Sequence, residues 1–408
     1  MPMRSISGIR LWGSCSPSLG KHDRRWVHEA VFGTIRLRGR LDHLLDHHVR
    51  RGVGSVPLHL LRVLRLGAYQ ILYMGSVPRY AAVSQTVEQA ATVGGTKGAG
   101  LGNAVLRALG EDGDDPAQFP NFDEDPVGHL SSWGSHPRWL VKRWVQRFGS
   151  AEARTIVGVG NRIPDLFLRP VGVGMEGTAE TLRGQGLDVS VDPGLSQILR
   201  LPPHIDPSAV LSEVPGIIQD PAAAETADFV RITENERVAD LCAAPGGKGI
   251  ALIDSGGWLV GLDRSLGRLK RMQASLRRLG LPERLVVARG EAPPLRTVDT
   301  VLVDAPCTGT GTLARHPDAR WRLTPKSPAR MAGVQSQILE GAARIVRPGG
   351  RLIYSTCTLE AEENEEVVES FLEIHEDFVL DEGEAFLSIL PGEKSTDGAF
   401  AARLRRNE

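Results

Sequence analysis

Two cysteines, an aspartate and a lysine stand just beyond apolar runs in the second half of this 408-residue chain: Cys357, Cys307, Asp304 and Lys248. Short apolar runs bounded by turn residues read as β-strands. The carboxyl ends of parallel strands open onto one ligand crevice, so we expect the four side chains to converge there. Two thiols beside a carboxylate and an ammonium group indicate covalent catalysis, because a thiolate is a strong nucleophile and a nearby cation favours its formation.

A loop of small residues, Cys242–Gly249, follows the first of these strands and opens a helix. Small residues let a ligand approach the backbone closely, and a helix N-terminus favours a negative charge such as a carboxylate. Asp263 ends the next strand, 17 residues after Gly246, where an acid accepts the hydroxyls of a ribose. The loop is not a P-loop, because Cys242 replaces its first glycine and Gly249 its Ser or Thr.

Paired thiols suit the modification of a pyrimidine at carbon 5. A thiolate that adds to carbon 6 of cytosine makes carbon 5 nucleophilic enough to accept a methyl group. The ring nitrogen N3 needs a partner during this addition, and a carboxyl group kept in its acid form by burial would serve. Residue chemistry alone does not decide whether Cys307 or Cys357 attacks. Cys15 and Cys242 are expected to be small buried residues.

The elements that must position these groups alternate between strand and helix after residue 236. The expected strands are Arg237–Leu241, Trp258–Asp263, Arg284–Ala288, Asp299–Val303 and Arg351–Tyr354. Alternating β and α elements predict an α/β, Rossmann-like domain with a parallel, doubly wound sheet.

Other patterns dominate the first half of the chain. Apolar residues at helical spacing between 24 and 109 predict an all-α bundle, with Leu58–Tyr73 as its most buried helix. Arg138–Phe148 reads as an amphipathic helix and Asp165–Arg169 as a strand. The expected domains are a helical domain at 1–110, an acidic linker at 111–135, a small α+β connector at 136–220 and the Rossmann-like domain at 221–408.

The bulk composition excludes several classes of protein. With 41% hydrophobic and 24% charged residues, the chain reads as globular. It has no run of about 18 apolar residues and no secretory signal in its first residues, so no membrane association is expected. Four cysteines without a CxxC pair argue against a disulfide scaffold and against a bound metal, and favour the reducing cytoplasm.

The charge is distributed unevenly although the net charge is only −1. Residues 1–110 hold 15 Lys and Arg against 5 Asp and Glu, and residues 264–289 hold eight bases against one acid. Both regions suit a polyanion such as RNA, although solvated helix faces would give the same pattern. The acidic run Glu360–Glu369 is expected to be an exposed helix face.

Several motifs resemble those of the RNA 5-methylcytosine methyltransferases: Ala243–Lys248, Asp304–Gly311, Arg315–Asp318 with Trp321, and Ser355–Thr358. Other segments resemble the NusB-type RNA-binding bundle that is fused to this core in the RsmB subgroup: Phe32–Arg36, Leu66–Tyr73, Ala82–Glu88 and Gly102–Arg107. The resemblance runs from about residue 24 to about residue 405.

The resemblance implies S-adenosylmethionine as cofactor and a cytosine of small-subunit (16S) ribosomal RNA as substrate. It implies that Cys357 is the nucleophile, that Cys307 helps to release the product, and that Asp304 holds the ring beside Lys248. The implied cofactor contacts are Cys242, Ala243, Ala244, Pro245, Gly246, Gly247, Lys248, Asp263, Glu291 and Asp304. Gly249 stands where the family usually has Thr, and Glu291 where it usually has Asp. A monomer is expected.

Two other functions stay open on the sequence. Gly249 at the start of the cofactor helix would suit a non-catalytic RNA-binding factor in ribosome assembly that has kept the fold. A cytosine-C5 methyltransferase for tRNA would use the same catalytic residues. Binding of S-adenosylmethionine separates the first alternative from an enzyme, and substrate competition separates the second.

Overall fold

The computed structural model describes residues 20–191, 197–203, 205–392 and 396–408, so Cys15 lies outside the described residues. The chain forms two compact units. The first, called the helical unit here, comprises residues 1–162 together with 313–323. The second, the sheet unit, comprises residues 163–312 and 324–408. Among the described helices, none is long and apolar enough to cross a membrane.

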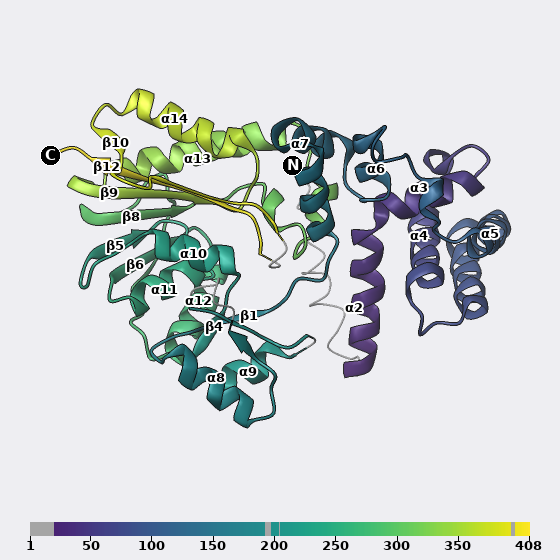
Figure 1. Cartoon of the computed structure of the whole chain (residues 1–408), viewed down its shortest axis with the longest axis horizontal. Coiled ribbons are helices and arrows are strands. Elements are labelled where there is room, and N and C mark those ends of the chain that lie inside the picture. Colours follow the sequence, from purple (N-terminus) through teal and green to yellow (C-terminus); the bar gives the residue numbers. More distant parts are fainter. Residues whose placement is uncertain (1–19, 192–196, 204, 393–395) are drawn as a thin grey trace. The chain divides into compact units, whose positions relative to one another are not determined.

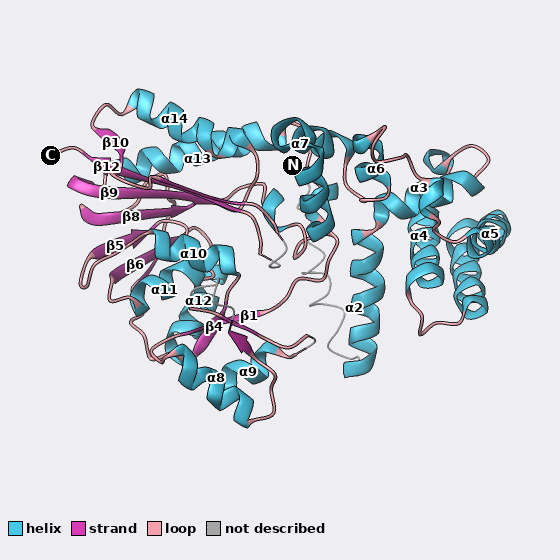
Figure 2. Ribbon diagram, viewed as in Figure 1, coloured by secondary structure: helices cyan, strands magenta, loops and turns pink. Residues whose placement is uncertain are grey.

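The described residues of the helical unit form helices and loops without a strand (Figure 2). Its helices are α2 (Lys21–Arg36), α3 (Arg38–His48), α4 (Leu58–Tyr73), α5 (Arg79–Asp112), α6 (Pro126–Ser132) and α7 (Arg138–Gly160). Short 3-10 turns lie at Val53–Ser55, Pro116–Gln118 and Ala319–Trp321. The expected helix Leu58–Tyr73 is confirmed as α4, and Leu60, Leu61, Leu64 and Ala68 of α4 are buried in the core of the unit. The helix expected at Arg138–Phe148 is the first half of α7.

A segment distant in sequence, 313–323, belongs to the helical unit. Trp321 donates its indole N–H to the carbonyl of Ile35 at 2.8 Å. The fully buried guanidinium of Arg320 donates to the carbonyl of Gly160 at 2.6 Å and to Oδ1 of Asn161 at 2.8 Å. The chain therefore leaves the sheet unit after Thr312 and completes the helical unit before it returns.

The sheet unit contains two sheets (Figure 1). The smaller sheet has the order β2-β3-β1-β4 and is antiparallel. Its elements are β1 (Phe167–Pro170), α8 (Met175–Gly184), β2 (Ser190–Val191), β3 (Leu199–Arg200), α9 (Pro207–Glu213) and β4 (Gly216–Ile218). The strand expected at Asp165–Arg169 is β1, displaced by one to two residues.

The larger sheet has the order β10-β12-β9-β8-β5-β6-β7, with β11 paired to β12. Its strands are β5 (Arg237–Asp240), β6 (Trp258–Asp263), β7 (Leu285–Val287), β8 (Val298–Asp304), β9 (Val346–Thr356), β10 (Phe378–Leu380), β11 (Phe386–Ile389) and β12 (Ala399–Arg406). The strands β5 to β9 pair in parallel, as the alternating pattern predicts. The sheet as a whole is mixed. Strand β12 pairs antiparallel with β9, and both β10 and β11 pair antiparallel with β12.

Helices cover both faces of the larger sheet. They are α10 (Pro221–Phe229), α11 (Gly247–Asp254), α12 (Leu266–Arg278), α13 (Ser327–Ala343) and α14 (Glu365–Ile374), and 3-10 turns lie at Thr310–Thr312 and Ala361–Glu363. Figure 1 shows α13 and α14 on one face and α10, α11 and α12 on the other. The central strands are buried on both faces, as parallel strands require.

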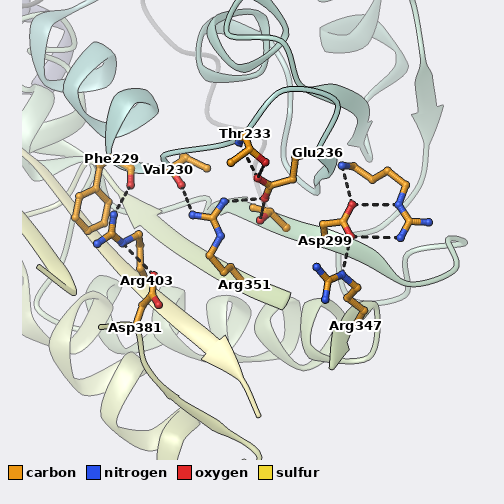
Figure 3. Close-up of polar contacts among 11 residues, drawn as sticks. Phe229, Val230, Thr233, Glu236, Asp299, Arg347, Arg351, Asp381 and Arg403 are labelled. Carbon is orange, nitrogen blue, oxygen red and sulfur yellow. Dashed lines mark hydrogen bonds and ion pairs between the residues drawn. The ribbon is translucent and has the colours of Figure 1, made fainter. Parts of the chain in front are cut away.

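Ion pairs join the amino ends of the parallel strands (Figure 3). Asp299, at the start of β8, accepts from Nε of Arg347 at 2.6 Å and from Nε of Arg237 at 3.1 Å. Glu236, just before β5, accepts from Arg351 at 2.7 Å. These contacts hold β5, β8 and β9 side by side at the edge opposite to the glycine-rich loop.

Candidate active site

The carboxyl ends of five adjacent strands bring the expected site residues together. The strands lie side by side in the order β9-β8-β5-β6-β7. Across the sheet, the residues that follow or end these strands are therefore Cys357, Asp304, the 242–248 loop, Asp263 and Glu291, in that order. The strands end at these positions because each buried apolar run gives way to polar or small residues. The convergence expected from the sequence is therefore found in the fold.

Asp304 and Lys248 form an ion pair in the middle of this edge. Nζ of Lys248 donates to Oδ1 of Asp304 at 2.8 Å, and the hydroxyl of Ser355 donates to the same oxygen at 3.0 Å. The Lys248 side chain is 12% exposed and that of Asp304 35% exposed. Burial alone would lower the pKa of Lys248, but the carboxylate of Asp304 more than offsets it and raises that pKa. Asp304 is therefore a partly exposed partner of a lysine, not the fully buried carboxyl group expected from the sequence.

The two thiols lie against each other beside this pair. The sulfurs of Cys307 and Cys357 are 3.4 Å apart, so one can donate a hydrogen bond to the other. The hydrogen bond to Cys357, together with burial, raises the pKa of Cys307 well above its ordinary value, and the charge of Glu363 adds to this effect. A negative charge on Cys357, in turn, is among the influences that raise the pKa of Lys248. The electrostatics therefore differ at the two sulfurs: Cys307 lies near a carboxylate, and Cys357 interacts favourably with an ammonium group.

A second acid lies beneath the glycine-rich loop. Asp240, the last residue of β5, is 1% exposed and accepts from the backbone N–H of Cys242 at 3.2 Å. Burial, followed by the charge of Asp304, raises the pKa of Asp240 to about 7. Burial also raises the pKa of Cys242, although its side chain is only partly buried and not the fully buried residue expected from the sequence.

Comparison with known proteins relates both halves of the chain to one group of enzymes. The 16S rRNA methyltransferase RsmB/F family matches residues 227–405, and the NusB family matches residues 14–111. A probable ribosomal RNA small subunit methyltransferase B of Synechocystis is 33% identical over 95% of this chain and 92% of its own length. Its counterpart in Bacillus subtilis is 33% identical over 96% and 92%. The chain belongs to the RsmB/F family of ribosomal RNA methyltransferases.

A solved structure agrees with this at the level of the fold. A methyltransferase homologue from Pyrococcus horikoshii is 24% identical, with a TM-score of 0.59 over 69% of this chain and 99% of its own. Membership of the family makes this protein an S-adenosylmethionine-dependent methyltransferase that acts on ribosomal RNA. Among the described residues, no group of three or more His, Cys, Asp or Glu side chains could hold a metal ion.

The loop of this methyltransferase fits S-adenosylmethionine. Gly246 caps α11 with a φ of 112°, and a Cβ atom there would come within 2.7 Å of Met272, so the turn requires glycine. Ala243 and Ala244 are buried, and Pro245 precedes the turn. The backbone N–H groups at the start of α11 point to where a carboxylate would bind. Gly249, the departure from the family pattern, lies within α11, and a Cβ there would come 3.3 Å from Oδ2 of Asp240.

Two acids further along the edge, Asp263 and Glu291, stand where the sequence predicts further cofactor contacts. Asp263 ends β6 and is 2% exposed; its Oδ1 accepts from the N–H of Ser265 at 2.8 Å, and its Oδ2 pairs with Arg268 at 3.2 Å. Arg268 also donates to the carbonyl of Ala244, so its guanidinium joins the loop to the acid. Glu291 lies partly buried in the turn after β7.

Gln219 is a site residue that the sequence interpretation missed. It follows β4, is 5% exposed, and has no hydrogen-bond partner for either atom of its amide among the described residues. Its Nε2 lies 3.5 Å from where a Cβ of Gly247 would be. A buried amide without partners beside the cofactor loop is costly unless a ligand satisfies it. No periodic pattern distinguishes such a residue in the sequence.

The expectation for the acidic run Glu360–Glu369 is wrong at its beginning. Glu360 is 2% exposed and Glu363 is fully buried, whereas Glu366 and Glu369 on α14 are exposed. Hydroxyl and amide groups near the two cysteines bind the carboxylate of Glu363, which the local composition does not reveal. The sequence offers one signal for such a carboxylate. A threonine directly follows each of Cys307 and Cys357, and buried hydroxyls need hydrogen-bond partners.

Proposed function

We propose that this enzyme methylates carbon 5 of a cytosine in small-subunit ribosomal RNA, with Cys357 as the covalent nucleophile. The 3.4 Å separation of the two sulfurs beside the Lys248–Asp304 pair carries the proposal. The hydrogen bond to Cys357, burial and the charge of Glu363 raise the pKa of Cys307, which makes that sulfur the less suitable of the two as the attacking thiolate and supports Cys357 in that role. This electrostatic difference adds to the family resemblance, which assigns the same roles.

In the first step the Cys357 thiolate forms a bond to carbon 6 of the flipped-out cytosine. The π electrons of the carbon 5–carbon 6 bond form a double bond between carbon 4 and carbon 5, and the π electrons of the carbon 4–N3 bond move onto N3, which takes up a proton. We assign that proton to the Lys248–Asp304 pair, since Nζ carries the proton shared with Asp304. The second oxygen of Asp304 accepts no hydrogen bond from the described residues, which leaves it available to the base.

S-adenosylmethionine supplies the electrophilic methyl group that carbon 5 then takes up. Release requires the loss of a proton from carbon 5 and the departure of Cys357. We assign the proton to the thiolate form of Cys307, whose position next to Cys357 suits this step. The electron pair of the carbon 5–hydrogen bond restores the ring double bond, N3 returns its proton, and the bond between carbon 6 and Cys357 breaks with its electrons on sulfur.

We propose that RNA docks through phosphate contacts of the basic N-terminal residues, which hold 15 Lys and Arg against 5 Asp and Glu. Nothing in the site favours the non-catalytic alternative, since each group needed for transfer is present. The relatives are named for ribosomal RNA, not for tRNA.

The deciding experiment measures transfer of labelled methyl from S-adenosylmethionine to unmethylated 16S ribosomal RNA. Wild type is expected to label carbon 5 of cytosine, and Cys357→Ala to lose activity by at least ~10⁴-fold. Cys307→Ala is expected to accumulate a covalent protein–RNA adduct that survives denaturing electrophoresis. Full activity of Cys357→Ala, or label at a position other than carbon 5, would contradict the proposal.

The pH dependence of release gives a second test. The raised pKa of Cys307 keeps its sulfur protonated at neutral pH, so the thiolate fraction grows with pH. The adduct in wild type is therefore expected to decay faster as the pH rises from 7 to 9. An adduct lifetime that is constant over this range would exclude Cys307 as the base.

A further inference from the structure

Glu363 connects the two segments that carry the cysteines. It ends the 3-10 turn between β9 and α14, and its side chain is fully buried. Its Oε2 accepts from the backbone N–H of Thr308 at 2.8 Å, and its Oε1 accepts from the hydroxyl of Thr308 and from that of Thr358 at 3.1 Å. Thr308 follows Cys307 and Thr358 follows Cys357, so one carboxylate holds the residue after each thiol.

Two further contacts complete the arrangement. Nε2 of Gln335, on α13, donates to Oε2 of Glu363 and to the carbonyl of Pro306, both at 3.0 Å. The hydroxyls of Thr308 and Thr358 lie 2.8 Å apart. Helix α13 therefore binds the backbone just before Cys307 directly, and the same amide binds the carboxylate that holds the residue just after Cys307.

The backbone N–H of Thr308 and the amide N–H of Gln335 can only donate to Oε2, whereas the two threonine hydroxyls that face Oε1 can donate or accept. These hydrogen bonds favour the ionised form of Glu363. Burial opposes ionisation and raises the pKa of Glu363, and no Arg or Lys among the described residues pairs with it. Such a buried charge is expensive unless every lone pair is satisfied. Its presence between the cysteine loops indicates a function beyond stability.

We infer that Glu363 is a positioning residue for methyl transfer: it locks the Cys307 and Cys357 loops together so that the two sulfurs face each other. The inference rests on the proposed function, in which both thiols react. The negative charge of Glu363 has a second effect, because it contributes to the raised pKa of Cys307 and so keeps that sulfur in the thiol form.

The test compares Glu363→Gln with Glu366→Gln in the full-length protein. Both substitutions remove one negative charge, but Glu366 is exposed on α14. Glu363→Gln removes the charge and one of the two acceptor oxygens that hold the cysteine loops, and it is expected to lower kcat for methyl transfer by ~10²-fold, with KM for S-adenosylmethionine unchanged. Glu366→Gln is expected to match wild type. Equal kcat values for the two variants would overturn the inference.

A measurement without RNA separates this inference from the proposed function. The rate of alkylation of each cysteine by iodoacetamide is followed by mass spectrometry as a function of pH. In Glu363→Gln the profile of Cys307 is expected to move to lower pH, while Cys242 stays slow because the fold persists. An unmoved Cys307 profile overturns the electrostatic role even if Cys357→Ala proves inactive. If Cys357→Ala proves active, the proposed function fails, but this profile still reports on Glu363.

A second pair of variants covers the case in which Glu363→Gln does not fold. Thr308→Val removes only the hydroxyl donor, whereas Thr308→Ser retains it. Thr308→Val is expected to lower kcat by ~10-fold, and Thr308→Ser to restore it. If both variants transfer methyl groups at the wild-type rate, the connection through Glu363 does not position the thiols.

Discussion

At the amino ends of β5, β8 and β9, arginines bind the carboxylates Glu236 and Asp299. At the carboxyl ends of the same strands a lysine binds Asp304, and Asp240 has no cationic hydrogen-bond partner among the residues that the structure describes. Arginine does not lose its proton in this pH range. Hydrogen bonds from Arg237 in particular hold the pKa of Asp299 well below its ordinary value. The charges at the amino ends therefore stay constant at every physiological pH.

The carboxyl ends behave in the opposite way. There the pKa of Asp240 is raised to about 7, and those of Lys248 and Cys307 are raised as well. Shifted titratable groups gathered in one place are typical of a reaction site. The edge at the amino ends thus contributes stability through permanent charges. The edge at the carboxyl ends holds groups with shifted pKa values, and the pKa of Asp240 lies close to neutral pH.

The difference between the two edges can be tested most directly by replacing one cation at each edge with an apolar side chain. Lys248→Met is expected to lower kcat by ~10³-fold, because the proton for N3 is lost. Arg347→Met, at the amino ends, is expected to leave kcat within twofold of wild type. The measurement is methyl transfer to unmethylated 16S ribosomal RNA. A comparable loss of kcat in both variants would show that the two edges are not functionally distinct.

The raised pKa of Asp240 predicts a pH-dependent stability. Its folded-state pKa lies above the unfolded value, so the contribution of the neutral acid is fully present below pH ~4 and is lost as the pH rises through about 7. Asp240→Asn stays neutral, so its stability relative to wild type is expected to rise between pH 4 and pH 7, by on the order of a few kcal/mol. Urea unfolding at several pH values measures this. A constant difference would mean that Asp240 is ionised throughout.

Gln219 allows a test of cofactor binding at the carboxyl ends of the strands. If its unpartnered amide serves S-adenosylmethionine, Gln219→Ala is expected to raise the dissociation constant for the cofactor ~10-fold. Gln185→Ala, which changes an exposed glutamine directly after α8, serves as the control. Calorimetry on the protein without RNA gives both constants. Identical affinities in the two variants would leave the buried amide without a ligand role.

The smallest effect is expected at the amino ends. Asp299→Asn removes the acceptor of Arg237 and Arg347, both of which are about half exposed, so a loss of about 1 kcal/mol in unfolding free energy is expected. Because the pKa of Asp299 is lowered, this loss is fully present at neutral pH, begins to shrink as the pH falls below ~4, and vanishes only as the pH falls through the lowered folded-state pKa. Thermal unfolding at pH 7 and pH 3 measures it, and kcat should not change.

Much of the sheet and most of the site follow from local patterns. The strand Trp258–Asp263 has the bounds expected from the sequence, and Asp304, Cys307 and Cys357 lie at strand ends as predicted. These predictions succeed because each depends on one apolar run and the residues directly after it. The kink at Gly95 in α5 lies between the segments Ala82–Glu88 and Gly102–Arg107, which resemble the NusB-type bundle.

Features that depend on distant partners were not predictable in this way. The strand β12 was missed, since its sequence Ala399–Arg406 mixes small, apolar and basic residues and it becomes a strand only by pairing with β9. Glu363 looked like part of an exposed acidic face because its donors, Thr308 and Gln335, lie 55 and 28 residues away. Burial of a polar group is decided by such long-range contacts, which composition does not encode.

The place of segment 313–323 in the helical unit has a consequence for protein synthesis. Helices α2 to α7 leave the ribosome first, but Arg320 and Trp321 cannot pack against them until residue 323 has been made. Bacterial translation at ~5–20 residues per second makes this delay about 10–30 s. Until then the carbonyl of Gly160 and the side chain of Asn161 lack the guanidinium that binds them in the finished fold. Proteolysis of ribosome-bound chains of increasing length is expected to show the N-terminal helices becoming resistant only after that point.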